Sequence, residues 1–257
     1  MATSLFGSII FGPIKSRRLG VSLGVNLLPS TGKVCSFDCV YCECGYNAER
    51  KGGLLPKVDE VKVALSEKLE EMHSKGDHLD VITFAGNGEP TMHPNFDQII
   101  DYTISLRDKY YPNAKVSVLS NSTRIDRPEV FNALLKVDNN ILKIDSAIQH
   151  TLDLINAPVG TEFDVDKLVS NLAAFKGKVI IQSLFLRGKI SGEIVDNTKE
   201  EEIVAWLDAM QKIQPESIMI YSLDRPTPAK ELIKVEKEEL EIIAQRARQL
   251  GFKVSVS

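Results

Sequence analysis

Helix-like and strand-like patterns of hydrophobic positions alternate along the chain from residue 58 onward. Between residues 58 and 75, apolar side chains recur among charged ones at helical spacing, at Val61, Leu65 and Leu69. Short runs rich in β-branched and aromatic residues, bounded by turn residues, stand between the helical segments. The predicted helices are 58–75, 95–110, 127–136, 164–175, 198–213 and 237–250, and the predicted strands are 20–28, 80–85, 114–119, 141–144, 178–186, 217–221 and 252–256.

Strands that alternate with helices are typical of βαβ units, whose strands pair in parallel through right-handed crossovers. The pattern repeats about six times, which is fewer than the eight units of a closed barrel. We therefore predict an α/β fold, namely a partial, open (β/α)6 barrel with helices outside a parallel sheet. No linker, repeat or low-complexity segment divides the chain, so residues 1–257 are expected to form one domain.

The composition narrows the class of protein. Hydrophobic residues make up 43% and charged residues 26% of the chain, which is ordinary for a soluble globular protein. No apolar run reaches the roughly 18 residues that a membrane span requires. The first residues lack the charged region and cleavage site of a secretory signal. We expect a cytoplasmic protein without a membrane segment.

All four cysteines lie within ten residues, at Cys35, Cys39, Cys42 and Cys44, inside the long predicted loop 29–57. Thiolates are metal ligands, and such dense spacing indicates a metal site. Three alternatives remain open: a disulfide, a structural zinc site and an electron-transfer cluster held by all four cysteines. No secretory signal favours a disulfide, and zinc sites usually use two separated ligand pairs. Cys44 follows Cys42 too closely for easy joint ligation of one cube.

The first three cysteines have the spacing C-x3-C-x2-C, with Tyr41 directly before the third. This motif resembles that of the radical S-adenosylmethionine (SAM) enzymes. The resemblance implies that Cys35, Cys39 and Cys42 hold a 4Fe–4S cluster, that its fourth iron binds SAM, and that Cys44 is not a ligand. It further implies reductive cleavage of SAM to a 5′-deoxyadenosyl radical that abstracts hydrogen from an unidentified substrate. An external one-electron donor, such as a flavodoxin or ferredoxin, would be needed.

Polar residues follow the predicted strands, at the end where barrel active sites lie. The segment Gly86-Asn87-Gly88-Glu89-Pro90 resembles the family's Gly-Gly-Glu-Pro motif, which contacts the amino group of SAM. Asn87 replaces one position of that motif or is an insertion. The candidate cofactor contacts are Tyr41, Gly86, Asn87, Gly88, Glu89, Pro90, Ser120, Asn121, Asp145, Gln182, Ser183 and Arg187.

Several of these candidates have a second interpretation. Ser120 and Asn121 would meet the ribose or carboxylate of SAM, but they also suit a helix N-cap. Asp145 would accept a hydrogen bond from a ribose hydroxyl. Lys143 and Arg187 are the catalytic candidates. Lys143 would be a desolvated base or Schiff-base nucleophile, or alternatively a surface or ion-paired lysine. Arg187 would clamp a carboxylate, or alternatively form a structural ion pair.

The segment 15–24 resembles radical enzymes related to the tRNA wyosine-synthesis family. Arg17 and Arg18 are expected to bind a phosphate or carboxylate of the substrate. Asp224 and Arg225 lie in a proline-rich loop that faces the substrate or is a stiff connection. Wyosine-forming enzymes hold a second cluster through upstream cysteines. Since this chain has no cysteine before Cys35, the resemblance does not extend to that reaction.

Charge is distributed unevenly along the chain. Residues 1–57 carry seven Lys or Arg against three Asp or Glu, whereas the whole chain has a net charge of −4. The basic segment favours an anionic substrate, such as a nucleotide or RNA. The lack of a nucleic-acid-binding module favours a small molecule or peptide, so a nucleic-acid partner stays open. A glycyl-radical activating enzyme and an iron–sulfur sensor without turnover are the alternative functions.

Overall fold

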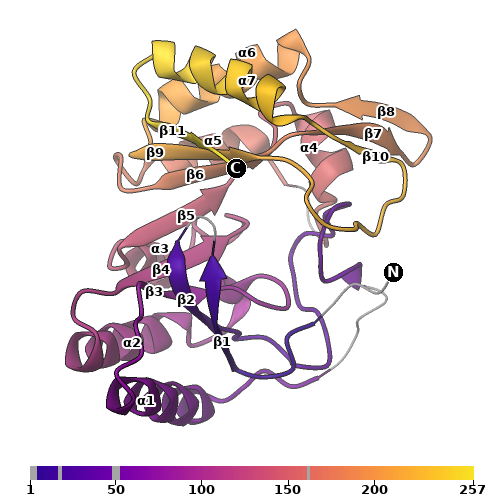
Figure 1. Cartoon of the computed structure of the whole chain (residues 1–257). Coiled ribbons are helices and arrows are strands. Elements are labelled where there is room, and N and C mark those ends of the chain that lie inside the picture. Colours follow the sequence, from indigo (N-terminus) through magenta and orange to yellow (C-terminus); the bar gives the residue numbers. More distant parts are fainter. Residues whose placement is uncertain (1–4, 17–18, 48–52, 161–162) are drawn as a thin grey trace.

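A computed structural model describes residues 5–16, 19–47, 53–160 and 163–257, and its helices and strands alternate along the chain (Figure 1). In chain order the described elements are β1 (Ile10–Ser16), β2 (Gly20–Val25), α1 (Val58–Ser74), β3 (Val81–Phe84), the 3-10 helix η2 (Pro90–Met92), α2 (Phe96–Tyr110), β4 (Lys115–Ser120), α3 (Pro128–Leu134), β5 (Asn139–Lys143), α4 (Gln149–Asn156), α5 (Val165–Ala173), β6 (Ile180–Leu184), β7 (Leu186–Ile190), β8 (Glu193–Asp196), α6 (Glu200–Ile213), β9 (Ser217–Tyr221), β10 (Leu232–Lys234), α7 (Lys237–Gln249) and β11 (Val254–Val256).

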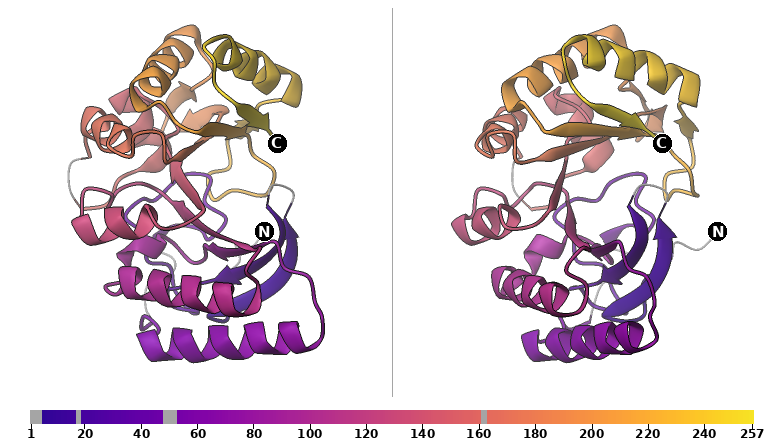
Figure 2. Two further views of the ribbon diagram at one scale, coloured as in Figure 1. Left: turned by 90° about the vertical axis from the view of Figure 1, so that its left-hand side faces the viewer. Right: turned by 60° about the vertical axis from the view of Figure 1, so that its left-hand side comes forward.

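The main sheet is open and has the strand order β1-β2-β3-β4-β5-β6-β9-β11. The strands from β2 to β11 pair in parallel, whereas β1 is antiparallel to β2 at one edge. At least one helix stands between each parallel strand and the next along the chain. The helices cover the outer face of the curled sheet (Figure 2). The predicted open (β/α)6 barrel is confirmed.

The two faces of the sheet differ because successive side chains of a strand point to opposite sides. On the outer face Ile82, Val118 and Ile181 are fully buried in the core that the sheet forms with the helices. On the inner face stand small or polar residues such as Ser22 and Gln182, together with a few apolar ones such as Leu119 and Met219. The outer face therefore carries most of the hydrophobic stabilisation, and the inner face is free for chemistry.

All of the predicted helices and strands are present, with ends shifted by a few residues. The predicted strand 178–186 ends at Leu184, and the chain continues into an unpredicted three-stranded sheet of order β10-β7-β8. Strand β1 and helix α4 were also not predicted from the sequence. β1 contains Gly12 and Pro13, which are tolerated at a sheet edge but weaken the strand pattern. Helix α4 has only eight residues, too few for a clear helical period.

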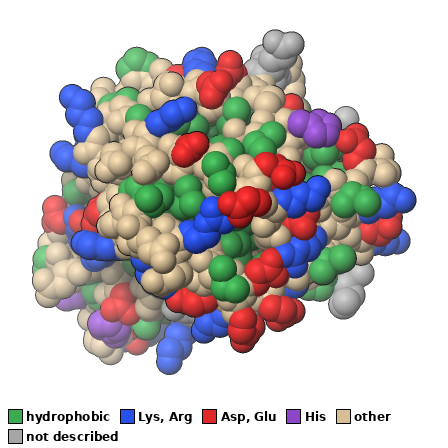
Figure 3. Space-filling view, turned by 90° about the horizontal axis from the view of Figure 1, so that it is seen from above, with side chains coloured by type: hydrophobic (Ala, Val, Ile, Leu, Met, Phe, Trp, Pro, Cys, Tyr) green, Lys and Arg blue, Asp and Glu red, His purple; other side chains and the backbone are tan. Residues whose placement is uncertain are grey.

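No helix in the described part of the chain combines the length and apolar character needed to cross a membrane. On the face that carries α6 and α7, at the top of Figure 1, acidic and basic side chains are interspersed (Figure 3). A surface that binds a nucleic-acid backbone gathers positive charge instead. This face therefore has a mixed, solvated character.

Candidate functional site

The cysteine loop, residues 29–47, is attached on one side to the glycine loop, residues 86–90, which follows β3. The Val34 amide donates to the Asn87 carbonyl, and the Glu89 amide donates to the Val34 carbonyl, both at 3.0 Å. Gly88 has a φ of +132°, and a Cβ there would lie 1.9 Å from the Val34 carbonyl oxygen. Only glycine permits this close approach.

The opposite side of the cysteine loop is attached to the end of α4. The amides of Asp38 and Val40 donate to the carbonyls of Asn156 and Ile155, each at 3.0 Å. The amide of Ala229, from the segment between β9 and β10, donates to the Val40 carbonyl at 3.1 Å. The loop is thus held from two sides over the carboxyl ends of the parallel strands, with the cysteines between the attachments.

Two of the motif cysteines lie against hydrogen-bond donors from the strand ends. The Asn121 side chain, after β4, donates to Cys35 Sγ at 3.5 Å. Cys39 Sγ accepts from Lys143 Nζ at 3.6 Å and from Asn156 Nδ2 at 3.5 Å. Donors around the sulfurs are a common feature of metal-bound thiolates, because they stabilise negative charge on sulfur.

The third motif cysteine, Cys42, has Cys44 as its neighbour. A hydrogen bond from the Cys44 thiol lowers the pKa of Cys42 to about 6, although burial opposes this shift. The positive charge of Lys33 also lowers the pKa of Cys42. The same bond raises the pKa of Cys44, whose Sγ also lies 3.5 Å from the Gly86 carbonyl oxygen. Cys42 therefore ionises first, and Cys44 stays a protonated donor. The expectation that Cys44 is not a cluster ligand stays a prediction.

The other two motif thiols resist ionisation. Burial raises the pKa of Cys35 to about 12, and the nearby charge of Cys39 adds to this effect. Burial also raises the pKa of Cys39, although the positive charge of Lys143 opposes it. Both thiols must lose protons before they bind a metal, so cluster binding would release protons here.

Lys33 brings a buried positive charge to the same loop. Its residue is 4% exposed, and its Nζ donates to the Gly45 carbonyl at 2.7 Å and to Asp38 at 3.3 Å. Burial opposes the charge, but the negative charges of Cys42 and Cys35 raise the pKa of Lys33 overall. This lysine, counted in the basic segment, therefore faces the cysteines rather than a substrate at the surface.

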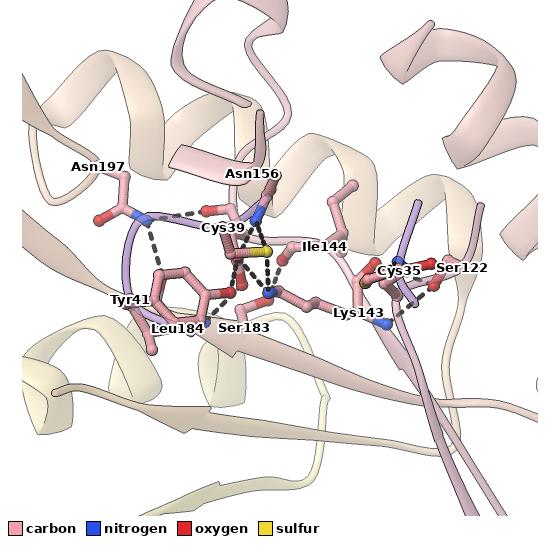
Figure 4. A network of polar contacts seen from close by, with 12 residues as sticks. Cys35, Cys39, Tyr41, Ser122, Lys143, Ile144, Asn156, Ser183, Leu184 and Asn197 are labelled. Atoms are coloured by element: carbon pink, nitrogen blue, oxygen red, sulfur yellow. Dashed lines mark hydrogen bonds and ion pairs between the residues drawn. The ribbon is translucent and has the colours of Figure 1, made fainter. Parts of the chain in front are cut away.

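A buried network joins Cys39 to the ends of β5 and β6 (Figure 4). Its centre is the Asp145 carboxylate, which is 1% exposed. One oxygen accepts from the Tyr41 hydroxyl and from Asn156 Nδ2 at 2.8 Å, and it lies 3.0 Å from Lys143 Nζ. The other oxygen accepts from the Leu184 amide at 2.9 Å. The carboxylate is thus engaged by four groups of the protein.

Lys143 is ion-paired, as one of the two interpretations expected. Its Nζ lies 4.3 Å from the centre of the Tyr41 ring, which adds a cation–π contact. Burial opposes its charge, but the negative charges of Asp145 and Cys39 raise the pKa of Lys143. A Schiff base requires a neutral amine, so this environment favours Lys143 as a buried charge beside Cys39.

Glu89 joins the glycine loop to the end of β4. It is 2% exposed, and its oxygens accept from Ser120 Oγ at 2.8 Å, the Asn121 amide at 2.6 Å and the Thr91 amide at 3.1 Å. Burial raises the pKa of Glu89, while these hydrogen bonds oppose the rise. Ser120 and Asn121 are thereby brought to the cysteines together with Glu89, and Pro90 begins η2 beside them.

Two candidate residues point away from the cysteines. Ser183 faces α6, where its hydroxyl accepts from Trp206 Nε1 at 2.9 Å. Arg187 lies in the second sheet and is ion-paired with Asp196 at 3.0 Å and with Glu239. The structural ion pair named as the alternative for Arg187 is therefore present.

The side chain of Asn87 is also occupied by the protein. Its amide exchanges two hydrogen bonds with the main chain of Phe6, at 2.8 and 2.9 Å, and donates to the Pro29 carbonyl at 2.8 Å. These bonds hold the N-terminal segment against the glycine loop. Arg17 and Arg18, the expected substrate ligands, lie outside the described residues.

Two cavities adjoin the strand ends. The rim cavity, of 330 Å³, is bordered by Tyr41 of the cysteine loop, Leu184 and Asp224. The lumen cavity, of 280 Å³, lies inside the barrel and is bordered by Gln182. Arg225 lines both cavities, so they are neighbours.

Several residues of the site were not predicted from the sequence. Lys33 and Asp38 stand within the cysteine loop, but nothing in their spacing shows that they pair. Asn156 ends the unpredicted helix α4, and Asn197 follows β8. Asn197 donates to the Asp145 and Leu184 carbonyls at 2.9 and 2.8 Å. Such partners are visible only once distant segments have been folded together.

The donor set suits a cluster held by three cysteines. All four thiols are free, and the described Cys, His, Asp and Glu side chains form no group of three that fits a single metal ion. A cubic cluster does not need such convergence, because each thiolate binds a different iron. Cys35, Cys39 and Cys42 sit on one anchored loop, and each has its own donor, so these residues fit the group.

Comparison with known proteins shows the family of the chain. Residues 30–196 match the family model described as the radical SAM superfamily. A UPF0026 protein, MJ1312, from Methanocaldococcus jannaschii is 31% identical over 91% of this chain and 68% of its own length. A protein named GTPase Obg from Brachyspira hyodysenteriae is 32% identical over 90% of this chain. This chain spans only 32% of the length of that protein.

Solved structures share the fold at low sequence identity. A radical SAM methyltransferase from Sphaerobacter thermophilus has a TM-score of 0.66 at 13% identity, over 92% of this chain and 65% of its own. SuiB from Streptococcus suis, bound to S-adenosylmethionine, has a TM-score of 0.64 at 12% identity, over 88% of this chain and 49% of its own. TYW1 with a lysine-pyruvate adduct bound has a TM-score of 0.61 at 14% identity, over 89% of this chain and 73% of its own. Fold, cysteine loop and family model agree, and the chain belongs to the radical SAM superfamily.

Proposed function

We propose that this chain binds a 4Fe–4S cluster through Cys35, Cys39 and Cys42 and uses it to cleave SAM reductively. The cluster would supply one electron to the sulfonium of SAM, and the resulting 5′-deoxyadenosyl radical would abstract hydrogen from a substrate. The observation that carries this proposal is the set of separate donors at the three motif sulfurs. Cys44, which donates to Cys42, would take no part in ligation.

The residues around the cysteines would hold the cluster and balance its charge. Lys33 and Lys143 place two buried ammonium groups beside the three thiolates. Asp145 and Tyr41 keep Lys143 in place, and Asn121 donates to Cys35. Positive charge and hydrogen bonds near the sulfurs favour the reduced state of a cluster. The protein would thus make one-electron reduction by a flavodoxin or ferredoxin less unfavourable.

We assign the rim cavity to SAM. Tyr41 and Leu184 offer aromatic and apolar surface to a planar base, and the cavity borders the cysteine loop. The glycine loop, Ser120 and Asn121 border the cysteines on the other side, where small residues leave room for the amino and carboxylate groups. These residues would orient SAM and keep water away from the radical.

The test is an anaerobic assay of 5′-deoxyadenosine. The chain is reconstituted with iron and sulfide, reduced with dithionite and mixed with SAM. We expect 5′-deoxyadenosine from the wild type and from Cys44→Ser, which keeps a donor beside Cys42. Cys39→Ala is expected to lose the product entirely. Cys44→Ser is the matched control, since both variants change one buried cysteine of the same loop.

Two results would contradict the proposal. An intact cluster that neither cleaves SAM nor binds it would favour the iron–sulfur sensor. Equal loss of the cluster in Cys44→Ser and Cys39→Ala would favour ligation by four cysteines. Cleavage in the wild type would leave the substrate open, including a protein substrate of the kind that a glycyl-radical activating enzyme modifies.

A further inference from the structure

The lumen cavity has one polar side chain without a partner. Gln182 is 8% exposed and borders the cavity. Its main chain pairs with β5, but among the described residues its side-chain amide makes no hydrogen bond. Its neighbours Ile181 and Ser183 face the helices instead. Because the amide atoms of Gln182 are not fully enclosed by the described residues, they face the cavity and can bind a ligand or water.

The remaining wall is built by the N-terminal segment. The rings of Phe6 and Phe11 stack with their centres 3.9 Å apart and both line the cavity. Asn87 holds the main chain of Phe6 through two hydrogen bonds. On β2, a Cβ at Gly24 would lie 2.1 Å from the Phe11 ring, so the ring rests directly on the strand. The aromatic wall is therefore fixed to the barrel and to the glycine loop.

Position links this cavity to the proposed chemistry. Arg225 separates it from the rim cavity, and Arg225 is ion-paired with Glu43 of the cysteine loop. A molecule in the lumen would lie next to the space assigned to SAM, where a radical could reach it. This step rests on the proposed function, but the existence of a binding pocket does not.

We propose that the barrel lumen binds a compact, mainly apolar substrate whose single uncharged polar group pairs with Gln182. The amide of Gln182 both donates and accepts, so a carboxamide or a similar carbonyl group is the best complement. Leu119, Ile141 and Met219 supply the apolar walls on the side of the sheet. Specificity arises because a ligand without the polar group leaves Gln182 unpaired.

The test measures binding of two probes of the same shape, phenylacetamide and isobutylbenzene, by ligand-observed NMR and calorimetry on the chain of residues 1–257 after reconstitution with iron and sulfide. Gln182→Leu is expected to weaken phenylacetamide binding about tenfold and to leave isobutylbenzene bound as well or better. Leu119→Trp, which fills the lumen, is expected to abolish binding of both. Gln211→Leu, the same exchange at an exposed position of α6, is the control and is expected to change neither.

Thermal unfolding separates a ligand-binding role from a structural one. Because the Gln182 amide has no protein partner, Gln182→Leu is expected to unfold at the same temperature as the wild type or higher. A lower unfolding temperature would mean that the amide stabilises the fold, and it would overturn the proposal. Absence of phenylacetamide binding to the wild type, or equal binding to the wild type, Gln182→Leu and Leu119→Trp, would overturn it as well.

The outcome is independent of SAM cleavage. If 5′-deoxyadenosine forms but the probes bind without regard to Gln182, the lumen inference fails and the proposed function stands. If the probes bind as expected but no SAM is cleaved, the pocket stands and the proposed chemistry fails.

Discussion

At the scale of single residues, the site depends on a buried ammonium group with three partners. Lys143 Nζ lies 3.0 Å from Asp145, 3.6 Å from Cys39 Sγ and 4.3 Å from the centre of the Tyr41 ring. The side chains of Lys143 and Asp145 are 12% and 0% exposed. In such a place the loss of one partner leaves the other charge without compensation.

Lys143→Met is expected to lower the free energy of unfolding by about 3–5 kcal/mol, because it leaves the Asp145 carboxylate buried without an opposite charge, with only hydrogen bonds from Tyr41, Asn156 and Leu184. Adding Asp145→Asn is expected to recover part of this loss, since the unpaired charge is then removed. The measurement is urea unfolding of the single and double variants.

The matched control is Lys136→Met, which removes an exposed ion pair with Asp101. Exposed ion pairs contribute little to stability, so Lys136→Met is expected to change the free energy of unfolding by only about 0–1 kcal/mol. A Lys143→Met variant that unfolds like the control would show that the buried pair is not the stabilising contact described above.

The residues of the site differ in how far the sequence reveals them. Cys35, Cys39 and Cys42 were predictable because ligand type and spacing are local properties of the chain. Asn156 was not, because it reaches Cys39 from 117 residues away. Ser183 lies near the end of β6 and Arg187 near the start of β7, where the alternation of side chains and the turn into β7 direct both away from the cysteines.

At the scale of elements, the contact between the cysteine loop and the glycine loop decides where the cysteines lie. Gly88→Ala is expected to lower the free energy of unfolding by about 1–3 kcal/mol more than Gly192→Ala, because the added methyl group meets the Val34 carbonyl. Iron content after reconstitution is expected to fall in Gly88→Ala alone. Urea unfolding and iron analysis are the measurements.

Gly192→Ala is a suitable control because Gly192 has a φ of +91° with open space around its Cβ position. The two variants share a strained φ and differ in the clash. Full iron content in Gly88→Ala would show that the close approach to Val34 is not needed to place the cysteines.

The parallel strands and their helices could be predicted because buried segments keep a regular hydrophobic period. The segments that connect these strands and helices could not be predicted. Helix α4 and the strands β7, β8 and β10 are short, and β10 pairs with β7 across more than forty residues. Their positions follow from tertiary packing, which no local pattern records.

At the scale of the whole molecule, the open barrel keeps two environments apart. The outer face of the sheet is aliphatic and buried under helices, whereas the inner face carries Ser22, Thr83 and Gln182 around a cavity. The cysteine loop lies over the carboxyl ends of the strands, next to the opening of that cavity. The residues that stabilise the fold and the residues that line the cavity therefore lie on opposite faces of the same strands.

The most direct test of this account is electron paramagnetic resonance of the reduced, reconstituted chain with and without SAM. If Cys35, Cys39 and Cys42 leave one iron open, a 4Fe–4S signal is expected, and SAM is expected to change its g-values. Cys44→Ser is expected to behave like the wild type. A signal that SAM leaves unchanged, or no 4Fe–4S signal at all, would contradict the assignment of this loop as a SAM-binding cluster site.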